Sequence, residues 1–388
     1  MSNHPLTLIN EANYTKAVAP KPVYDYMRDV RGWDHKVGIN AKAQNSPSTG
    51  VAIEQSAEAL NCIMGFGGVF VALFGNSPFE QGRITGSQES RLTMWRDMFK
   101  NAAFPSDYRL SQLPERPFGG LADYFMWMYG DGTNMYFVVT GDDGTPPKNE
   151  KGNVRFTRVK GDPSMLEFMA GNEWSGIDTH SGEVVPVVPD LGHFAMNQFT
   201  QFSAARIRYG LKSSVSVEPK QLVAAVAAGN AATEALFRDV CDYAYIEGRD
   251  PGANFPDAFL RSIDSKMAET MVMAPSALQA GIIANLDRAT NFRQSVGWEA
   301  LNGLRDAAIK DGMQASYKGR NIRDVAMQVI ELAREGLSKD EEALLAYPHY
   351  VVSTGMNGAG RALHQFEQLK GNDLDKIKVI TRERAIVL

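Results

Sequence analysis

Residues 243–249 read YAYIEGR, and their alternation predicts a β-strand. Side chains two positions apart in a strand lie on the same face, so Tyr245, Glu247 and Arg249 would project together with Tyr243. A carboxylate beside a guanidinium group can hold a hard cation and an anionic phosphate next to each other. A cross-strand or surface salt bridge would give the same spacing and is commoner in proteins generally. The spacing leaves both interpretations open.

The segments before this strand predict more sheet, and the segments after it predict helices. Residues 134–140 (NMYFVVT) and 154–159 (VRFTRV) have strand patterns, and the polar linker between them is typical of a hairpin loop. Residues 183–190 contain two prolines, so a strand there would lie at a sheet edge. From about residue 257 to the end, the chain is mainly helical in pattern. This order favours a single α+β domain over a doubly wound α/β fold.

Residues 53–74 have apolar side chains at helical spacing and predict a buried amphipathic helix. They include Gly65-Phe66-Gly67-Gly68, which lacks the Lys-Ser/Thr ending of a phosphate-binding loop, so close helix packing explains the glycines better. A second helix is expected over 219–239, with Pro219 in its first turn. A third has an apolar stripe of Ile322, Val325, Val329 and Leu332, and Gly336 offers its stop.

Three further arginines are candidates for anion binding. Arg206 and Arg208 are two positions apart, so on a strand they would share a face and form a local anion site, whereas on a helix they would diverge. Arg91 lies in the glycine-containing loop 76–95, and loops carry binding residues disproportionately. An ordinary surface arginine would look the same in sequence.

Composition narrows the class of protein. The 388 residues carry a formal net charge of −5, which gives no sign of a nucleic-acid partner, although a few local arginines could still bind small anions. Cys62 and Cys241 are far apart in the sequence, and the six histidines lack metal-binding spacing. The start has no secretory pattern, and the longest apolar stretch is too short to cross a bilayer. We therefore expect a cytoplasmic protein without a membrane partner.

The order of several segments resembles the glutamate–cysteine ligase family, including its plant and proteobacterial branch. The likeness covers roughly residues 21–388, and residues 1–20, which are polar and without a pattern, are expected to form a loosely ordered start. The segments that carry it are NSPFEQG and SRLTMW (within 76–95), NMYFVV (134–139), FSAARIR (202–208), YIEGRDPGANF (245–255), PSALQAGIIANLD (275–287) and VVSTGMNGAGRAL (351–363).

The resemblance implies a catalytic domain related to glutamine synthetase, in which an antiparallel sheet curled into a funnel is surrounded by helices. It also implies ATP and Mg²⁺ as cofactors. The γ-carboxylate of glutamate would be phosphorylated, and the amine of cysteine would displace phosphate to give γ-glutamylcysteine, the first step of glutathione synthesis. Such phosphoryl transfer gathers negative charge, which metal ions and arginines stabilise.

The resemblance also implies roles for individual residues. Glu247 would be a metal ligand, Arg249 would contact phosphate or the acyl phosphate, and Arg91 would bind a glutamate carboxylate. The remaining candidates would bind substrate or ATP: Arg206 and Arg208 near phosphate, Tyr136 and Trp95 lining the pocket, and Gln44 facing the site from a strand.

One feature of the family is missing from the sequence. Family members have several metal-binding glutamates on their first strands, but residues 1–50 contain only four acidic residues and no ExE pair. Glu247 alone could not supply the oxygen ligands of two or three magnesium ions. We therefore expect that these strands come from a missing segment or a separate chain. The alternatives are a degenerate relative that binds nucleotide or amino acid or regulates a partner, a ligase with another amine substrate, and a structural protein without ligands.

Overall fold

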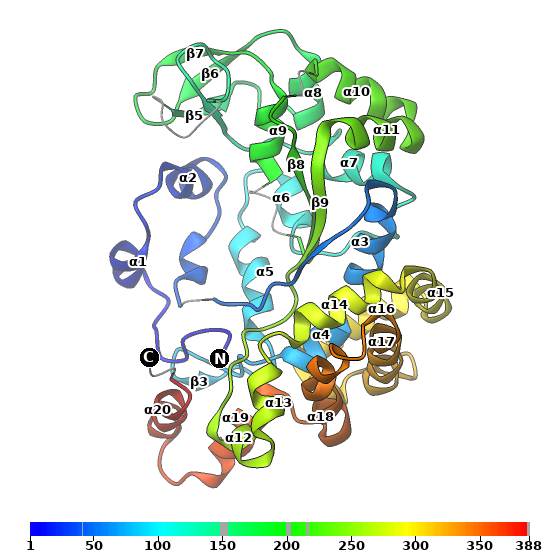
Figure 1. Cartoon of the computed structure of the whole chain (residues 1–388). Coiled ribbons are helices and arrows are strands. Elements are labelled where there is room, and N and C mark those ends of the chain that lie inside the picture. The colour runs from blue at the N-terminus through cyan, green and yellow to red at the C-terminus, as the bar shows by residue number, and fades with distance from the viewer. Residues whose placement is uncertain (41, 148–153, 199–202, 215–216, 386–388) are drawn as a thin grey trace.

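The computed structural model describes residues 1–40, 42–147, 154–198, 203–214 and 217–385. Helices dominate, and the strands form small antiparallel sheets, so the predicted α+β class is confirmed. Figure 1 shows strands β8 and β9 running through the middle of the molecule, a second sheet at one end and a group of helices at the other.

The central sheet has three strands in the order β1-β9-β8. Strand β9 (Cys241–Gly248) pairs with β8 (Ala205–Leu211) on one side and with β1 (Ser48–Gly50) on the other, both antiparallel. The strand interpretations of 243–249 and of the Arg206 segment are therefore confirmed. In this register Arg206 lies opposite Glu247, and Arg208 lies opposite Tyr245. Opposite residues of an antiparallel pair share a face, so one face of the sheet is charged.

The other face of this sheet is apolar and covers the core. Ile207 and Ile246 are buried there, and helix α3 (Ser56–Gly65) packs against both β8 and β9. The alternation of charged and apolar side chains along the two strands therefore decides which face meets the core and which face carries the candidate site.

The helix predicted over 53–74 is broken into three pieces. A 3₁₀ turn, η3 (Ile53–Gln55), precedes α3, and α4 (Gly67–Phe74) follows at a bend of 47°. A Cβ on Gly67 would lie 2.2 Å from Oδ2 of Asp250, and one on Gly68 would lie 2.9 Å from the backbone nitrogen of Arg305. The expectation that these glycines serve close packing is confirmed.

No helix in the described parts of the chain is by itself long and apolar enough to cross a membrane. Helices α3 and α4 reach that length only together and across their bend, and nearly all of their residues are buried inside the molecule.

The second sheet is an antiparallel meander of four strands in the order β4-β5-β6-β7. The predicted hairpin partners, β4 and β5, are neighbours, although part of the linker between them lies outside the described residues. Strand β7 contains Pro186 and lies at the edge, as predicted. The bounds are β4 (Val138–Thr140), β5 (Arg155–Val159), β6 (Trp174–Asp178) and β7 (Val184–Val187).

Two helices replace the single one predicted over 219–239. Gly229 has a φ of +100°, a conformation that favours glycine, and it separates α10 (Pro219–Ala228) from α11 (Asn230–Val240). Pro219 begins α10 as expected. Other helices at the end of the molecule that holds the four-stranded sheet are α7 (Leu121–Tyr129), α8 (Met165–Ala170) and α9 (Leu191–Asn197) (Figure 1).

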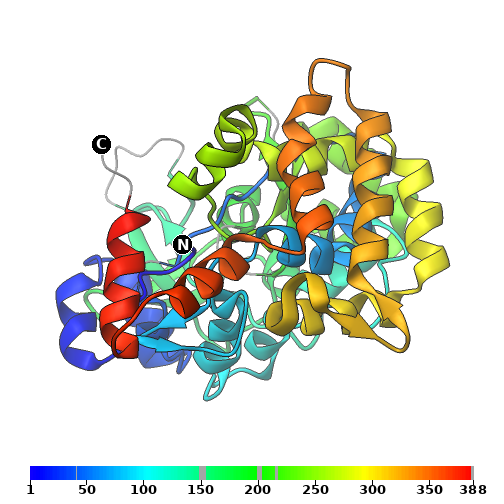
Figure 2. The same cartoon turned by 90° about the horizontal axis from the view of Figure 1, so that it is seen from below.

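The C-terminal part is helical, as predicted, with one short hairpin of β10 (Ser316–Tyr317) and β11 (Arg320–Asn321). Figure 2 shows its longer helices standing side by side as one group. The four residues of the predicted stripe are buried on α17, which ends at Gly336. The helices are α12 (Ala258–Ile263), α13 (Ser265–Thr270), α14 (Ala274–Ala284), α15 (Leu286–Val296), α16 (Trp298–Asp311), α17 (Ile322–Gly336), α18 (Ala346–Thr354), α19 (Gly358–Gln368) and α20 (Asp373–Glu383).

Residues 1–20, for which we expected a loosely ordered start, contain helix α1 (Glu11–Ala17) and several buried contacts. Ser2 and Asn3 are buried, and Oγ of Ser2 donates to Glu89 at 3.0 Å. A funnel-shaped sheet stays a prediction, because the described strands form separate small sheets. Other elements before β4 are α2 (Pro22–Asp25), β2 (Phe79–Glu80), β3 (Arg83–Ile84), the 3₁₀ turn η4 (Ser90–Thr93), α5 (Met94–Phe99) and α6 (Pro105–Arg109).

Candidate active site

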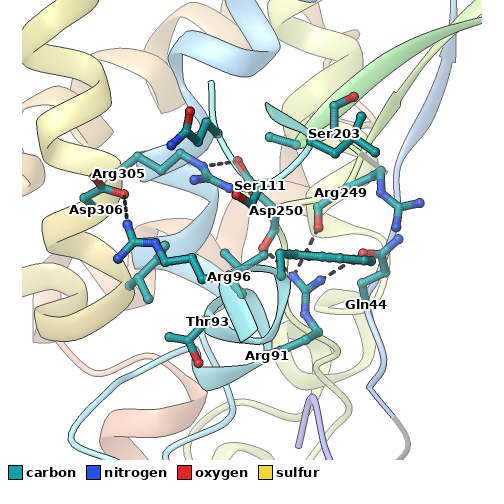
Figure 3. A pocket seen from close by; sticks show the side chains of 16 residues that line it. Gln44, Arg91, Thr93, Arg96, Ser111, Ser203, Arg249, Asp250, Arg305 and Asp306 are labelled. Carbon is teal, nitrogen blue, oxygen red and sulfur yellow. Dashed lines mark hydrogen bonds and ion pairs between the residues drawn. The ribbon is translucent and has the colours of Figure 1, made fainter. Parts of the chain in front are cut away.

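A cavity of about 230 Å³ lies where the charged face of the central sheet ends. Four of the predicted site residues line it: Gln44, Arg91, Trp95 and Arg249. Figure 3 shows Gln44 and Arg249 on one side of this space, and Arg96 and Asp306 on the other. The cavity therefore joins the end of β9 to the η4–α5 segment and to helix α16.

The chain leaves β9 at Gly248 and forms the wall of the cavity with its next residues. Gln44 and Gly252 form an isolated antiparallel bridge, which fixes the segment before β1 to the segment after β9. Asn254 donates to the carbonyl of Phe74 at 2.6 Å, so the same segment is also tied to the end of α4. These contacts hold Arg249 and Asp250 in place beside the loop that carries Arg91.

Arg91 is buried, so its interpretation as an ordinary surface arginine is wrong. Its Nε donates to Glu89 at 3.0 Å, and its Nη1 donates to Oε1 of Gln44 at 3.0 Å. Its Nη2 donates to the carbonyl oxygens of Arg249 at 3.1 Å and Asp250 at 2.9 Å. Arg91 therefore fastens its loop to the segment after β9, and its guanidinium forms part of the cavity wall (Figure 3).

Glu247, Arg206 and Arg208 do not line the cavity, but Glu247 lies two residues before Arg249 and is surrounded by the three arginines. Arg206 donates from Nε and Nη2 to the two carboxylate oxygens at 3.1 and 2.8 Å, and Nη1 of Arg249 donates at 3.0 Å. Nε of Arg208 lies 3.9 Å from the carboxylate. Among the described residues, three positive charges thus meet one negative charge at this face, inside a chain that is negative overall.

The neighbouring groups keep both Glu247 and Arg249 charged. Burial raises the pKa of Glu247, but the hydrogen bond and charge of Arg206, with the charges of Arg249 and Arg208, outweigh burial and leave this pKa below its ordinary value. Burial and the nearby Arg206 lower the pKa of Arg249 to about 10, so this arginine stays protonated at neutral pH. The cluster therefore keeps its positive excess under physiological conditions.

The residues described do not form a magnesium site. In the described parts of the chain, no group of three or more His, Cys, Asp or Glu side chains is placed to hold a metal ion. Both oxygens of Glu247 already accept hydrogen bonds from guanidinium groups. A cation at this carboxylate would meet three guanidinium groups, and magnesium prefers six oxygen ligands.

The two aromatic candidates lie in different places. Trp95 lines the cavity, and its ring centre lies 5.9 Å from Cζ of Arg249, within range of a cation–π interaction. Tyr136 is buried in a separate cluster, where Cζ of Arg31 lies 4.1 Å from its ring centre. It does not line the cavity. Tyr136 precedes the first residue of β4, so strand periodicity could not place its side chain.

Several cavity residues were missed by the sequence reasoning. Asp250 and Arg305 form a buried pair with distances of 3.0 and 2.7 Å, which connects the segment after β9 to α16. Asp250 directly follows the predicted Arg249 and could have been found there. Arg305 and Asp306 come from a C-terminal helix whose pattern shows only a helix, so only the folded chain brings them to the site.

A comparison with protein-family models gives a match over the part of the chain that carries Gln44, Arg91 and Trp95. The model of the protein family described as glutamate-cysteine ligase family 2 matches residues 14–115. No curated protein matches the chain. Gln44, Arg91 and Trp95 fall inside the matched residues, whereas Glu247 and Arg249 fall outside them. Over residues 14–115, the chain is therefore similar to glutamate-cysteine ligase family 2, which supports a ligase-type function at the level of the family.

Proposed function

We propose that this chain is an ATP-dependent carboxylate–amine ligase that forms γ-glutamylcysteine from glutamate and cysteine. The observation that carries the proposal is the cluster of Arg206, Arg208 and Arg249 around Glu247, which adjoins a cavity built in part from the family-matched segment. Arginines in this number suit carboxylate and phosphate groups, because the guanidinium fork matches both geometries.

The size of the cavity supports a small ligand. Small-molecule sites usually enclose about 300–1,000 Å³, and this cavity of about 230 Å³ would suit an amino acid better than a whole nucleotide. We propose that glutamate occupies the cavity and that the ATP phosphates approach it beside Arg249. Arg91 would fix the cavity wall through its hydrogen bonds to neighbouring groups, and its remaining N–H group would donate to the ligand.

The reaction would proceed in two transfers. An oxygen of the glutamate γ-carboxylate attacks the γ-phosphorus of ATP, ADP leaves, and γ-glutamyl phosphate forms. The amine of cysteine, or of another acceptor, then attacks the acyl carbon, phosphate leaves, and the amine loses a proton to solvent. The positive excess around Arg249 would stabilise the charge that gathers at the phosphoryl group in the first transfer.

Magnesium belongs to this proposal, with ligands from outside the described residues. When bound, it would neutralise phosphate charge and orient the triphosphate. We propose that its carboxylate ligands come from a separate chain that supplies glutamate-rich strands of the kind found in the family. We further propose a cytoplasmic location, since both cysteines are buried and unpaired.

A second candidate function is a non-catalytic relative that binds nucleotide or amino acid or regulates a partner. The observation that favours it is the pairing of Glu247 with arginines, which leaves this carboxylate unsuited to a metal ion. Such a protein would retain the anion site and lose phosphoryl transfer.

A phosphate-release assay separates the two candidates. The purified chain is incubated with ATP, Mg²⁺ and glutamate, with and without cysteine, and ligand binding is measured in parallel. Phosphate release that requires the amine and equals the γ-glutamylcysteine formed would support the ligase, and would refute the need for a separate chain. Binding without release supports the second candidate, unless a chain with glutamate-rich strands restores turnover. Absence of both binding and release would contradict both candidates.

A further inference from the structure

Arg96 differs from the other arginines of the cavity in its freedom to move. It lies on α5, and its side chain is 66% exposed, whereas those of Arg91 and Arg305 are 3% and 10% exposed. Arg91 and Arg305 are each held by at least two hydrogen bonds to neighbouring groups. A long exposed side chain keeps its rotamer freedom in the free protein, so it can turn toward a ligand without breaking a buried contact.

The ion-pair partner of Arg96 is equally accessible. Nη2 of Arg96 lies 3.6 Å from Oδ1 of Asp306, whose side chain is 62% exposed. Exposed pairs of this kind contribute little to stability, because water screens the charges and both side chains lose entropy. Asp306 can therefore hold Arg96 in the free protein and can be displaced by a competing anion.

Arg96 and Asp306 both line the cavity, and they come from two different helices. Arg96 comes from α5 next to Trp95, and Asp306 comes from α16 next to Arg305 (Figure 3). The pair lies on the side of the cavity away from Gln44 and Arg249. An anionic ligand held by the Arg249 side would place its other end near Arg96.

We propose that Arg96 is a specificity-determining residue, which exchanges its ion pair with Asp306 for one with an anionic group of the ligand. This inference rests on the proposed function for the location of the ligand, and it adds a second anion contact at the opposite wall. Asp306 then acts as a competitor: it neutralises Arg96 in the empty cavity and disfavours ligands that lack an anionic group at that end.

A double-mutant cycle tests the exchange. Binding of inorganic phosphate, L-glutamate and ATP is measured by calorimetry for the wild type, Arg96→Gln, Asp306→Asn and the double variant. Arg96→Gln should weaken binding about tenfold, since it removes a charged hydrogen-bond donor. Asp306→Asn should tighten binding by up to roughly fivefold, since it frees Arg96 from an exposed pair. The double variant should match Arg96→Gln, because the competitor matters only while Arg96 is present.

Glu299→Gln is the matched control. It removes the same charge from the same helix, but Glu299 pairs with Lys318 and does not line the cavity. Its affinities should equal those of the wild type, which separates a local exchange from a general change in charge.

The three probes distinguish this inference from the function it rests on. The probe whose affinity changes across the four proteins as predicted identifies the anion that contacts Arg96. If phosphate follows the cycle while glutamate and ATP do not bind, the inference stands and the ligase proposal fails. If the wild type binds a probe and neither single variant changes its affinity, Arg96 has no such role. If the wild type binds none of the three, the inference is overturned together with the proposed function.

Discussion

At the scale of single residues, the site depends on one carboxylate that lies close to three guanidinium groups. Glu247 lies among Arg206, Arg208 and Arg249, and it reduces the repulsion between them without cancelling their charge. Removing one member of a buried charged cluster costs more than the pair contributes, because the remaining charge is left without compensation. Glu247 therefore positions the arginines, and the arginines together provide a positive potential for a ligand.

A histidine away from the cavity gives a prediction about pH. His193 is buried on α9, and burial lowers its pKa to about 4, against an opposing effect of Asp190. The unfolded chain binds a proton near pH 6.5 and the folded chain does not, so the free energy of unfolding should fall as pH drops from 6.5 to 4. The full loss would be on the order of 3 kcal/mol.

Urea denaturation at pH 7 and pH 5 measures this effect. In His193→Phe the part of the pH dependence due to this residue should disappear, and the ring can retain its edge-on contact with Phe168. The exposed His364 provides a control, because His364→Gln removes a histidine elsewhere and should retain the pH dependence that His193 contributes. Equal pH dependence in His193→Phe and the wild type would show that His193 is not the responsible group.

The sequence predicted some of these residues and not others, for a physical reason. Strand periodicity relates Glu247 to Arg249 and Arg206 to Arg208, and the pairing of two strands then brings them together. Tyr136 lies before its strand, and its environment depends on Arg31, which is more than a hundred residues away in the sequence. Contacts of this kind follow from tertiary packing and have no local signal.

At the scale of elements, the bend between α3 and α4 brings the core helix close to the cavity. Gly67 approaches Asp250 and Gly68 approaches Arg305, so two glycines allow the helix to pass behind the buried pair of Asp250 and Arg305. A side chain at either position would push against this pair. The apolar pattern of 53–74 predicted the helix, but the close contacts of Gly67 and Gly68 at its bend come from the segment after β9 and from α16.

Gly68→Ala tests this packing. The added Cβ would lie 2.9 Å from the Arg305 backbone, which cannot move as a flexible side chain would, so we expect a loss of about 1–3 kcal/mol in the free energy of unfolding. Gly360→Ala is the control, since the nearest atom to its Cβ in helix α19 would be 3.6 Å away. Alanine is favoured over glycine in helices by up to about 1 kcal/mol, so this variant should be neutral or slightly stabilised. Equal stabilities of the two variants in urea denaturation would contradict the account.

Element boundaries were predicted less well than element types. The region 219–239 is helical as expected, but Gly229 adopts a positive φ and divides it into α10 and α11. A glycine inside a helical pattern can be tolerated or can end the helix, and the choice depends on what the two halves pack against. Edge strand β7 was predicted well, because Pro186 cannot donate a ladder hydrogen bond whatever its surroundings.

At the scale of the whole molecule, the fold places segments from several distant parts of the sequence around one space. The Gln44 segment, the Arg91 loop, the end of β9 and helix α16 all line the cavity. The family match covers the Gln44 segment and the Arg91 loop. The end of β9 and helix α16 lie outside the match, and the fold brings them to the same cavity. The central claim is that this space, with the arginines behind it, binds anionic ligands.

Calorimetric titration of ATP with Mg²⁺ tests that claim most directly, in the wild type, Arg249→Ala and Arg238→Ala. Arg238 forms an exposed pair with Glu54 outside the cavity, so it controls for the loss of one positive charge. We predict that the wild type and Arg238→Ala bind with equal affinity and that Arg249→Ala binds at least about tenfold more weakly, since it loses a charged hydrogen-bond donor. Equal affinity in a folded Arg249→Ala variant would contradict the account and leave residues 243–249 as ordinary sheet.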